Sequence, residues 1–207
     1  MHLRRPGREL LPAEHALEPG VDVARAPRPS RIALASCSHW PGGRGDHAGL
    51  AEALAARGAR AEWVPWDDPT ADWSDYDLVF LRETWDYPPK LPAFLDWVDS
   101  LAAGSTVVNP PAVVRWNHHK GYLLELAAAG VPVVPTTLVA GGATDLDAAV
   151  RAAGADVVVV KPAVGIGGND ARRGRAHDPA TTEHLRELLR AGDVLVQPYL
   201  PSIETTG

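Results

Sequence analysis

The stretch Val157-Val158-Val159-Val160-Lys161-Pro162-Ala163-Val164-Gly165-Ile166-Gly167-Gly168-Asn169 decides how this chain is interpreted. Its four valines predict a buried β-strand, because β-branched side chains fit a sheet that is covered on both faces. The strand ends in Lys161, and a loop with three glycines follows. Phosphate binding uses both parts, since a cation attracts the oxygens and glycine N–H groups can approach closely where no Cβ intervenes. The segment therefore indicates a phosphate site.

Two familiar phosphate motifs do not fit this loop. No Gly-Lys-Ser/Thr closes it, which excludes a Walker A loop, and the glycine spacing differs from that of a dinucleotide fingerprint. We expect Pro162, which has no N–H to donate, to end the strand pairing and leave Lys161 at the exit of the sheet. A glycine-rich hairpin turn with a surface lysine stays open as the alternative.

Working towards the N-terminus, residues 31–112 alternate short apolar strands with helices. The expected strands span 31–36, 61–66, 76–81 and 106–109, and the clearest helix spans 91–103, just before Gly104. Apolar strands that alternate with helices over short loops predict a parallel sheet in a Rossmann-like α/β layout.

Residues 113–207 lose this regular alternation. We expect helices over 119–129, 145–153 and 180–191, and extended segments over 133–139, 156–161 and 194–197. Lys120 would stand in the first turn of its helix, where the helix dipole disfavours a cation, so an anionic partner is indicated. An ordinary solvated lysine is the alternative. Arg172, Arg173 and Arg175 either reach an anion or form a solvated hairpin tip.

The segment from Val194 to Glu204 is a strand that runs into a proline-punctuated connector. Such a connector can offer backbone groups to the edge of an adenine ring, and Glu204 could accept hydrogen bonds from ribose hydroxyls. A plain junction between a strand and a loop is the alternative.

In this order and on this scaffold, the three segments resemble the ATP-grasp superfamily over about residues 31–207. The resemblance implies an α/β protein with a Rossmann-like parallel-sheet pre-ATP-grasp domain over 31–112. The first, incomplete part of an ATP-grasp α+β module would follow over 113–207. It also implies the cofactor ATP, whose phosphates would contact Lys120 and Lys161.

The same resemblance implies roles for the loop and the connector. The lid over the phosphates would consist of Gly165, Ile166, Gly167 and Gly168. The adenine would meet Gln197 and the backbone of Tyr199 and Leu200, and the ribose would meet Glu204.

Arg82-Glu83-Thr84-Trp85-Asp86-Tyr87, after the third expected strand, looks like the front domain of one ATP-grasp subgroup. That subgroup includes a cyclo-ligase that acts on O-ureido-D-serine. The resemblance implies that Arg82, Trp85 and Asp86 contact a small amino-acid-like substrate, and that a carboxylate–amine ligation proceeds through an acyl-phosphate.

Magnesium is the second cofactor that the resemblance implies, because the metal neutralises charge as a phosphoryl group moves. In the family its ligands lie downstream of the connector, so we expect them beyond Gly207 and expect no metal site in this chain. The predicted function is therefore the ATP-binding part of a ligase, incomplete as given. A non-catalytic nucleotide- or metabolite-binding module stays open, as does a flavodoxin-like domain that does not use ATP.

Composition sets the remaining limits. Residues 1–30 contain five prolines, and their apolar residues show no sustained helical or strand periodicity. This predicts a disordered extension. The net charge of −6 disfavours nucleic acid and anionic membranes as partners, and no apolar run approaches the length of a bilayer span. One cysteine, Cys37, fits a reducing compartment, so the expected location is the cytoplasm. The sequence shows no legible oligomer interface.

Overall fold

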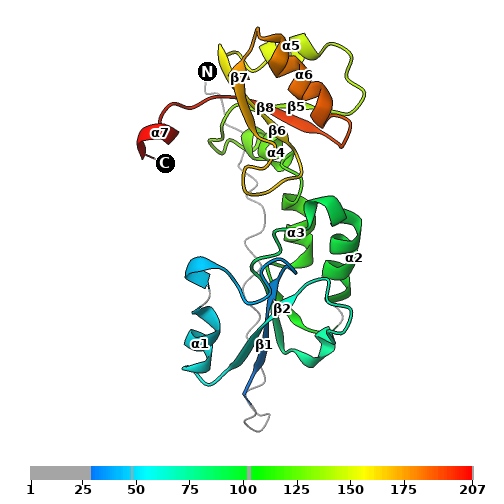
Figure 1. Ribbon diagram of the computed structural model, residues 1–207, viewed down its shortest axis with the longest axis vertical. Helices are drawn as coiled ribbons and strands as arrows, with labels where there is room; N and C mark the ends of the chain where they lie inside the picture. The colour runs from blue at the N-terminus through cyan, green and yellow to red at the C-terminus, as the bar shows by residue number, and fades with distance from the viewer. Residues whose placement is uncertain (1–28, 48, 102–103, 207) are drawn as a thin grey trace, which may run out of the picture.

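The structure, a computed structural model, describes residues 29–47, 49–101 and 104–206 (Figure 1). The elements form two halves stacked along the long axis, each built around its own four-stranded sheet. The predicted α/β class is confirmed. Apart from Pro29 and Ser30, the predicted disordered extension lies outside the described residues.

The front half contains the parallel sheet that the alternation predicts. Its strands lie in the order β2-β1-β3-β4, and every pair is parallel. Their bounds are β1 Arg31–Ser36, β2 Arg60–Pro65, β3 Leu78–Leu81 and β4 Thr106–Val108. The third strand begins two residues later than predicted, because Tyr76 instead ends the short 3₁₀ turn η2 at Trp73–Asp75.

Helices α1 (Leu50–Ala55) and α2 (Leu91–Leu101) belong to this front half. Helix α2 buries Phe94, Val98 and Leu101, whose spacing of three to four residues makes one apolar face. The predicted end of α2 at residue 103 lies outside the described residues. Two further 3₁₀ turns, η1 (Gly45–His47) and η3 (Pro88–Lys90), shape the loops that face the other half.

Helix α3 (Pro111–Asn117) was not predicted. The pair Pro110-Pro111 does stop strand β4, but Pro111 also starts a helix, since a proline at the first helical position gives up no hydrogen bond. Arg115 on α3 binds Asp99 on α2. The predicted domain boundary after residue 112 falls within α3 and stays a prediction.

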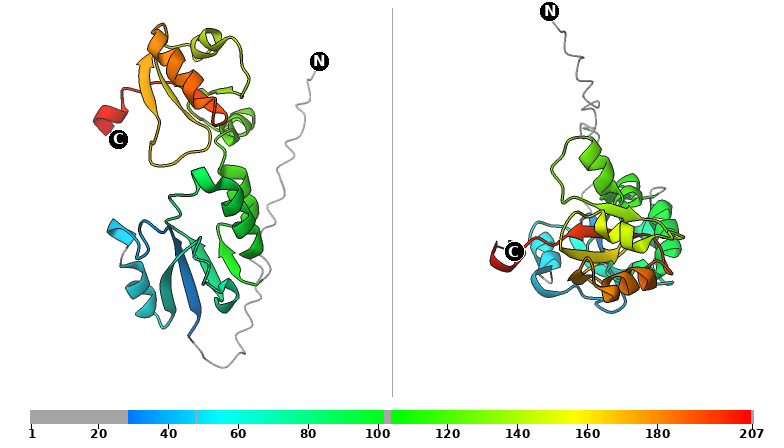
Figure 2. Two further views of the ribbon diagram at one scale, coloured as in Figure 1. Left: turned by 45° about the vertical axis from the view of Figure 1, so that its right-hand side comes forward. Right: turned by 90° about the horizontal axis from the view of Figure 1, so that it is seen from above.

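The rear half holds an antiparallel sheet in the order β5-β8-β6-β7. Its strands are β5 Thr137–Val139, β6 Val157–Pro162, β7 Arg172–Arg175 and β8 Val194–Pro198. Helices α5 (Leu146–Arg151) and α6 (Pro179–Leu188) cover one face (Figure 2). The core between them contains Val158, Val160, Val194, Val196 and Leu185.

Strand β6 ends at Pro162, as predicted, and Pro162 lies opposite Val194. Three other local expectations in this half were wrong. The three arginines form strand β7 rather than a hairpin tip. Helix α4 begins at Tyr122 and runs to Ala128, so it leaves out Lys120. The connector after β8 ends in a short helix, α7 (Ile203–Thr206), that its prolines did not predict.

Alternation along the strands separates the two faces of this sheet. Val158 and Val160 face the core under α5 and α6, so Val159 and Lys161 lie on the opposite face. Gln197 and Arg173 are the direct partners of Val159 on the flanking strands and share that face. The candidate site lies on it. No helix among the described residues is long and apolar enough to cross a membrane.

The close approach of β7 to α6 gives a test of the packing. A Cβ at Gly174 would lie 2.2 Å from the Thr181 hydroxyl oxygen, and Thr181 is buried. We expect Gly174→Ala to lower the free energy of unfolding by about 1–3 kcal/mol, because α6 must move to admit the methyl group. Chemical denaturation measures this. Gly42→Ala is the control, since a Cβ there meets no atom within 4 Å; equal stability of the two variants would contradict the packing.

Candidate functional site

Lys161 lies at the end of β6, on the sheet face away from α5 and α6. It is half-buried, and this burial lowers the pKa of its ammonium group. Among the described residues no carboxylate forms an ion pair with it. A half-buried ammonium group without an opposite charge nearby is electrostatically unfavourable, so the site favours an anionic ligand.

Lys120 approaches the same place from the turn between α3 and α4. This corrects the predicted position in the first turn of a helix, and the argument from the helix dipole does not apply. Its backbone N–H donates to the Ala163 carbonyl at 2.8 Å, and its ammonium donates to the Gly165 carbonyl at 2.5 Å. Burial lowers the pKa of Lys120, and the nearby charge of Lys161 lowers it further. The structure therefore brings the two predicted lysines together.

The loop from Gly165 to Gly168 connects β6 to β7 beside these lysines. Gly167 and Gly168 have φ angles of 64° and 75°, a region that favours glycine. At its far end the loop is held by His184, whose Nε2 lies 2.9 Å from the Asp170 carbonyl oxygen. The loop is therefore fixed at both ends, while the segment between them has no side chains larger than Ile166.

The residues predicted to contact adenine lie along β8 and just after it. Gln197 is buried, and its amide donates to the Thr136 hydroxyl at 2.7 Å. The Tyr199 N–H donates to the Val157 carbonyl, so it extends the sheet. The Leu200 N–H donates to no group among the described residues, and Leu200 is exposed. Of the two backbone N–H groups in the predicted adenine site, that of Tyr199 is used by the sheet and that of Leu200 has no partner among the described residues.

Glu204 makes a surface cluster that the sequence did not predict. Its carboxylate binds the Arg173 guanidinium at 2.7 Å and also accepts from the Tyr199 hydroxyl. The hydrogen bond from Tyr199, and then that from Arg173, lowers the pKa of Glu204. The Arg173 guanidinium lies 3.9 Å from the centre of the Tyr199 ring. Arg173 lies on strand β7. The ion pair between Arg173 and Glu204 was not predicted because this strand was not predicted.

The predicted substrate residues of the front half have different environments. Arg82 contacts His47 through its guanidinium, and Trp85 is 39% exposed. Asp86 accepts hydrogen bonds from the Trp66 indole at 2.7 Å and from Lys90 at 3.0 Å. Its carboxylate therefore orders the loop rather than standing free. Asp86 and Trp85 line the same cavity, opposite Gly165 and Ile166 of the glycine loop.

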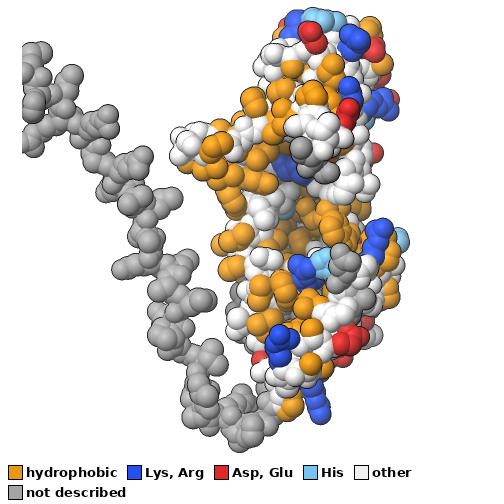
Figure 3. Space-filling view, turned by 90° about the vertical axis from the view of Figure 1, so that its left-hand side faces the viewer, with side chains coloured by type: hydrophobic (Ala, Val, Ile, Leu, Met, Phe, Trp, Pro, Cys, Tyr) orange, Lys and Arg blue, Asp and Glu red, His pale blue; other side chains and the backbone are white. Residues whose placement is uncertain are grey.

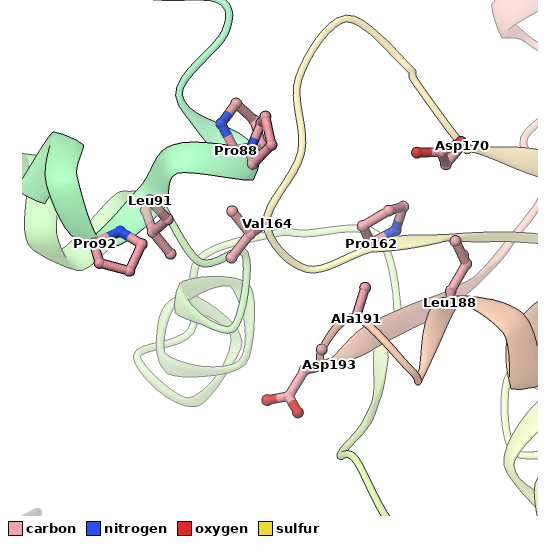
Figure 4. A pocket seen from close by; sticks show the side chains of 11 residues that line it. Pro88, Leu91, Pro92, Pro162, Val164, Asp170, Leu188, Ala191 and Asp193 are labelled. Atoms are coloured by element: carbon pink, nitrogen blue, oxygen red, sulfur yellow. The ribbon is translucent and has the colours of Figure 1, made fainter. Parts of the chain in front are cut away.

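Three cavities have lining residues from both halves, and the space-filling view shows a hollow between the halves with hydrophobic side chains in it (Figure 3). One, of about 520 Å³, has Pro88, Leu91 and Pro92 on the front side and Pro162 and Leu188 on the rear side (Figure 4). A second, of about 510 Å³, lies between the loop around Glu83 and the glycine loop. A third, of about 450 Å³, has Trp85 and Asp86 on the front side and Gly165 and Ile166 on the rear side. Among the described residues, no three His, Cys, Asp or Glu side chains gather to hold a metal.

Comparisons with known proteins bear on this arrangement. Residues 32–109 match the family described as the N-terminal domain of D-cycloserine synthetase DcsG. The cycloserine biosynthesis protein DcsG of Streptomyces lavendulae is 37% identical over 165 residues, which is 76% of this chain and 55% of that protein. The crystal structure of D-cycloserine synthetase DcsG superposes with a TM-score of 0.76 at 34% identity, covering 86% of this chain and 62% of that one.

A RimK-domain ATP-grasp protein from Sphaerobacter thermophilus superposes with a TM-score of 0.61 at 23% identity. The superposition covers 83% of this chain and 64% of that one, so the two proteins share a fold. The chain is therefore similar in sequence to D-cycloserine synthetase DcsG and shares its fold with an ATP-grasp protein. D-alanyl-alanine synthetase A from Vibrio cholerae has the same fold, with a TM-score of 0.57 at 15% identity over 83% of this chain and 60% of that one. The chain spans between about half and two thirds of the length of these ATP-grasp relatives.

The coupling between the two lysines can be measured directly. We expect Lys161→Met to raise the pKa of Lys120, because the nearby charge is lost, and to leave it below the ordinary value, because burial remains. The sequence has three lysines, Lys90, Lys120 and Lys161, so NMR of ¹³C-methylated lysines resolves each titration. Lys161→Arg retains the charge and should leave the Lys120 pKa low; a Lys120 pKa that is the same in both variants would show that the charges do not interact.

Proposed function

We propose that this chain is the ATP-binding part of a carboxylate–amine ligase that acts through an acyl-phosphate on a small amino-acid-like substrate. The carrying observation is the pair Lys120 and Lys161, which meet beside a glycine loop with no carboxylate partner among the described residues. The relatives named D-cycloserine synthetase and D-alanyl-alanine synthetase support this class, because both names denote the synthesis of small amino-acid derivatives.

A triphosphate fits the electrostatics of this pair. Burial and mutual repulsion disfavour the charged state of Lys120, and burial does so for Lys161. Phosphate oxygens placed near both ammonium groups would reverse this penalty, because an opposite charge within about 4–6 Å stabilises a buried cation. The backbone of Gly167 and Gly168 would then lie near the same oxygens.

The sugar and base would lie farther along the sheet, towards Leu200 and Glu204. The free Leu200 N–H is the donor that an adenine ring would meet. To accept a hydrogen bond from a ribose hydroxyl, Glu204 would have to give up its contact with the Tyr199 hydroxyl or with Arg173. Both of these contacts are exposed. Solvent screens exposed pairs of this kind, so the exchange costs little.

In the proposed reaction a carboxylate oxygen of the substrate attacks the γ-phosphorus of ATP, and ADP leaves. An amine nitrogen then attacks the acyl carbon, inorganic phosphate leaves, and the amine loses a proton. Lys120 and Lys161 would act by charge and position, because neither acts as an acid or base in these steps. Magnesium would neutralise the charge that moves with the phosphoryl group, and among the described residues no three His, Cys, Asp or Glu side chains gather to hold it.

One other function fits the lysine pair, because two cations beside a glycine loop also suit a module that only binds phosphates. In that reading the chain binds a nucleotide or metabolite without chemistry of its own. Formation of ADP in the presence of ATP, magnesium and a small amino acid separates the two functions, since a binding module would produce none.

The nucleotide role of Lys161 is tested by calorimetry on the 207-residue chain. We expect Lys161→Gln to weaken ATP binding at least tenfold, because a charge-assisted contact to phosphate is lost. Lys90→Gln is the matched control: Lys90 pairs with Asp67 and Asp86 on the front half, so its loss should leave ATP affinity within twofold of the unsubstituted chain. Unchanged affinity in Lys161→Gln, or no ATP binding by the unsubstituted chain, would refute the proposal.

A further inference from the structure

The turn that carries Lys120 is attached to the rear half at two successive residues. Lys120 itself donates its backbone N–H to the Ala163 carbonyl at 2.8 Å. Its neighbour His119 reaches Asp193, whose Oδ2 lies 3.3 Å from the His119 Nε2. The second attachment belongs to two side chains that have no part in the proposed function.

The surroundings of His119 indicate which ring nitrogen carries the proton. The Gly121 N–H donates to Nδ1 at 3.1 Å, so Nδ1 must present a lone pair. In the neutral ring the proton is then on Nε2, the nitrogen that faces the Asp193 carboxylate. His119 can therefore bind Asp193 in its neutral form, without adding a positive charge next to Lys120.

The His119 ring lies so close to Gly121 that a larger residue would displace it. A Cβ at Gly121 would lie 2.8 Å from Nδ1 and 3.2 Å from Cε1 of the ring. The φ angle of Gly121 is −55°, so its backbone conformation suits any residue. The position of the ring, rather than the shape of the turn, therefore favours glycine here.

Asp193 joins three segments of the rear half. Its backbone carbonyl accepts from the Ala163 N–H at 2.8 Å, and its Oδ1 accepts from the Gly141 N–H at 3.2 Å. Ala163 is fully buried and directly follows β6, and Asp193 directly precedes β8. His119 and Lys120 thus attach to two residues that are themselves hydrogen-bonded to each other at the ends of paired strands.

This attachment decides where the Lys120 ammonium lies. None of the seven residues of α4, all of them in the described part of the chain, is buried, so apolar packing fixes the segment after the turn only weakly. The polar contacts of the turn have to hold it instead. Because Lys161 lies two residues before Ala163 on β6, the separation of the two ammonium groups depends on these contacts.

We propose that His119 is a positioning residue for nucleotide binding, and that its contact with Asp193 keeps the Lys120 ammonium beside Lys161. This inference rests on the proposed function, because the separation of the lysines matters for ligand binding only if both hold phosphates. His119 touches no ligand and acts through Lys120. Asp193 has the same role from the rear sheet.

The titration of Lys120 tests this positioning without any nucleotide. In NMR of the ¹³C-methylated 207-residue chain, His119→Asn should raise the pKa of Lys120 towards its ordinary value, because the ammonium moves away from Lys161. Asparagine retains an acceptor near the Gly121 N–H but is too short to reach Asp193. The pKa of Lys161 is lowered by burial and should stay low, which shows that the variant is folded.

Two further variants make this titration specific. His119→Gln, whose longer amide can reach Asp193, should leave the Lys120 pKa low. Gly121→Ala retains His119 but displaces its ring, so it should raise the Lys120 pKa as His119→Asn does. An unchanged Lys120 pKa in His119→Asn, or an equal rise in His119→Gln, would overturn the proposal.

ATP affinity, measured by calorimetry, gives the second arm. We expect His119→Asn to weaken ATP binding about fivefold, the effect of one lost hydrogen bond, and His119→Gln to stay within about twofold of the unsubstituted chain. His177→Asn, the same change at an exposed histidine between β7 and α6, is the matched control and should also stay within about twofold.

The two arms separate this inference from the proposed function. Absence of ATP binding by the unsubstituted chain would refute the proposed function, and the Lys120 titration would still decide whether His119 positions the lysine. Intact ATP binding with the same affinity in His119→Asn would refute this inference alone.

Discussion

The contact of Lys120 with the segment after β6 is the interaction on which the site depends. The backbone of Lys120 binds the Ala163 carbonyl and its ammonium binds the Gly165 carbonyl, so one residue joins the turn before α4 to the glycine loop. This contact places the Lys120 ammonium beside Lys161, and the Gly165 carbonyl accepts one of its hydrogen bonds. Without it the loop would be a glycine hairpin beside a single lysine.

The division into two halves gives this lysine pair its surroundings. A parallel sheet in front supplies the loop with Glu83 and Trp85, and an antiparallel sheet behind supplies the lysines and the glycine loop. Neither sheet alone encloses a cavity of this kind, because its walls come from residues that lie about 80 positions apart in the chain. Nucleotide and substrate would therefore meet where the halves meet, as in other proteins whose sites lie between domains.

Local pattern was enough to predict the fold class and to single out Lys161, and it failed where long-range packing decides. Lys120 lies in a turn, so the argument from the helix dipole was wrong, and only the family resemblance paired it with Lys161. The valine run and the alternation of strands and helices are local signals, and both sheets contain the strands they predict. The sequence Arg172-Arg173-Gly174-Arg175 has no β-strand pattern; it becomes β7 because β6 offers an unpaired edge and Gly174 lets α6 approach. His119 was missed for a related reason, since nothing in the sequence shows that its ring reaches Asp193.

The most direct test of the central claim is a crystal structure of the 207-residue chain grown with a non-hydrolysable ATP analogue. The account predicts electron density for the phosphate chain between Lys120 and Lys161, with Gly167 and Gly168 against it and the base near Leu200. Density for the analogue at any other place, or none at a saturating concentration, would contradict the assignment of this site.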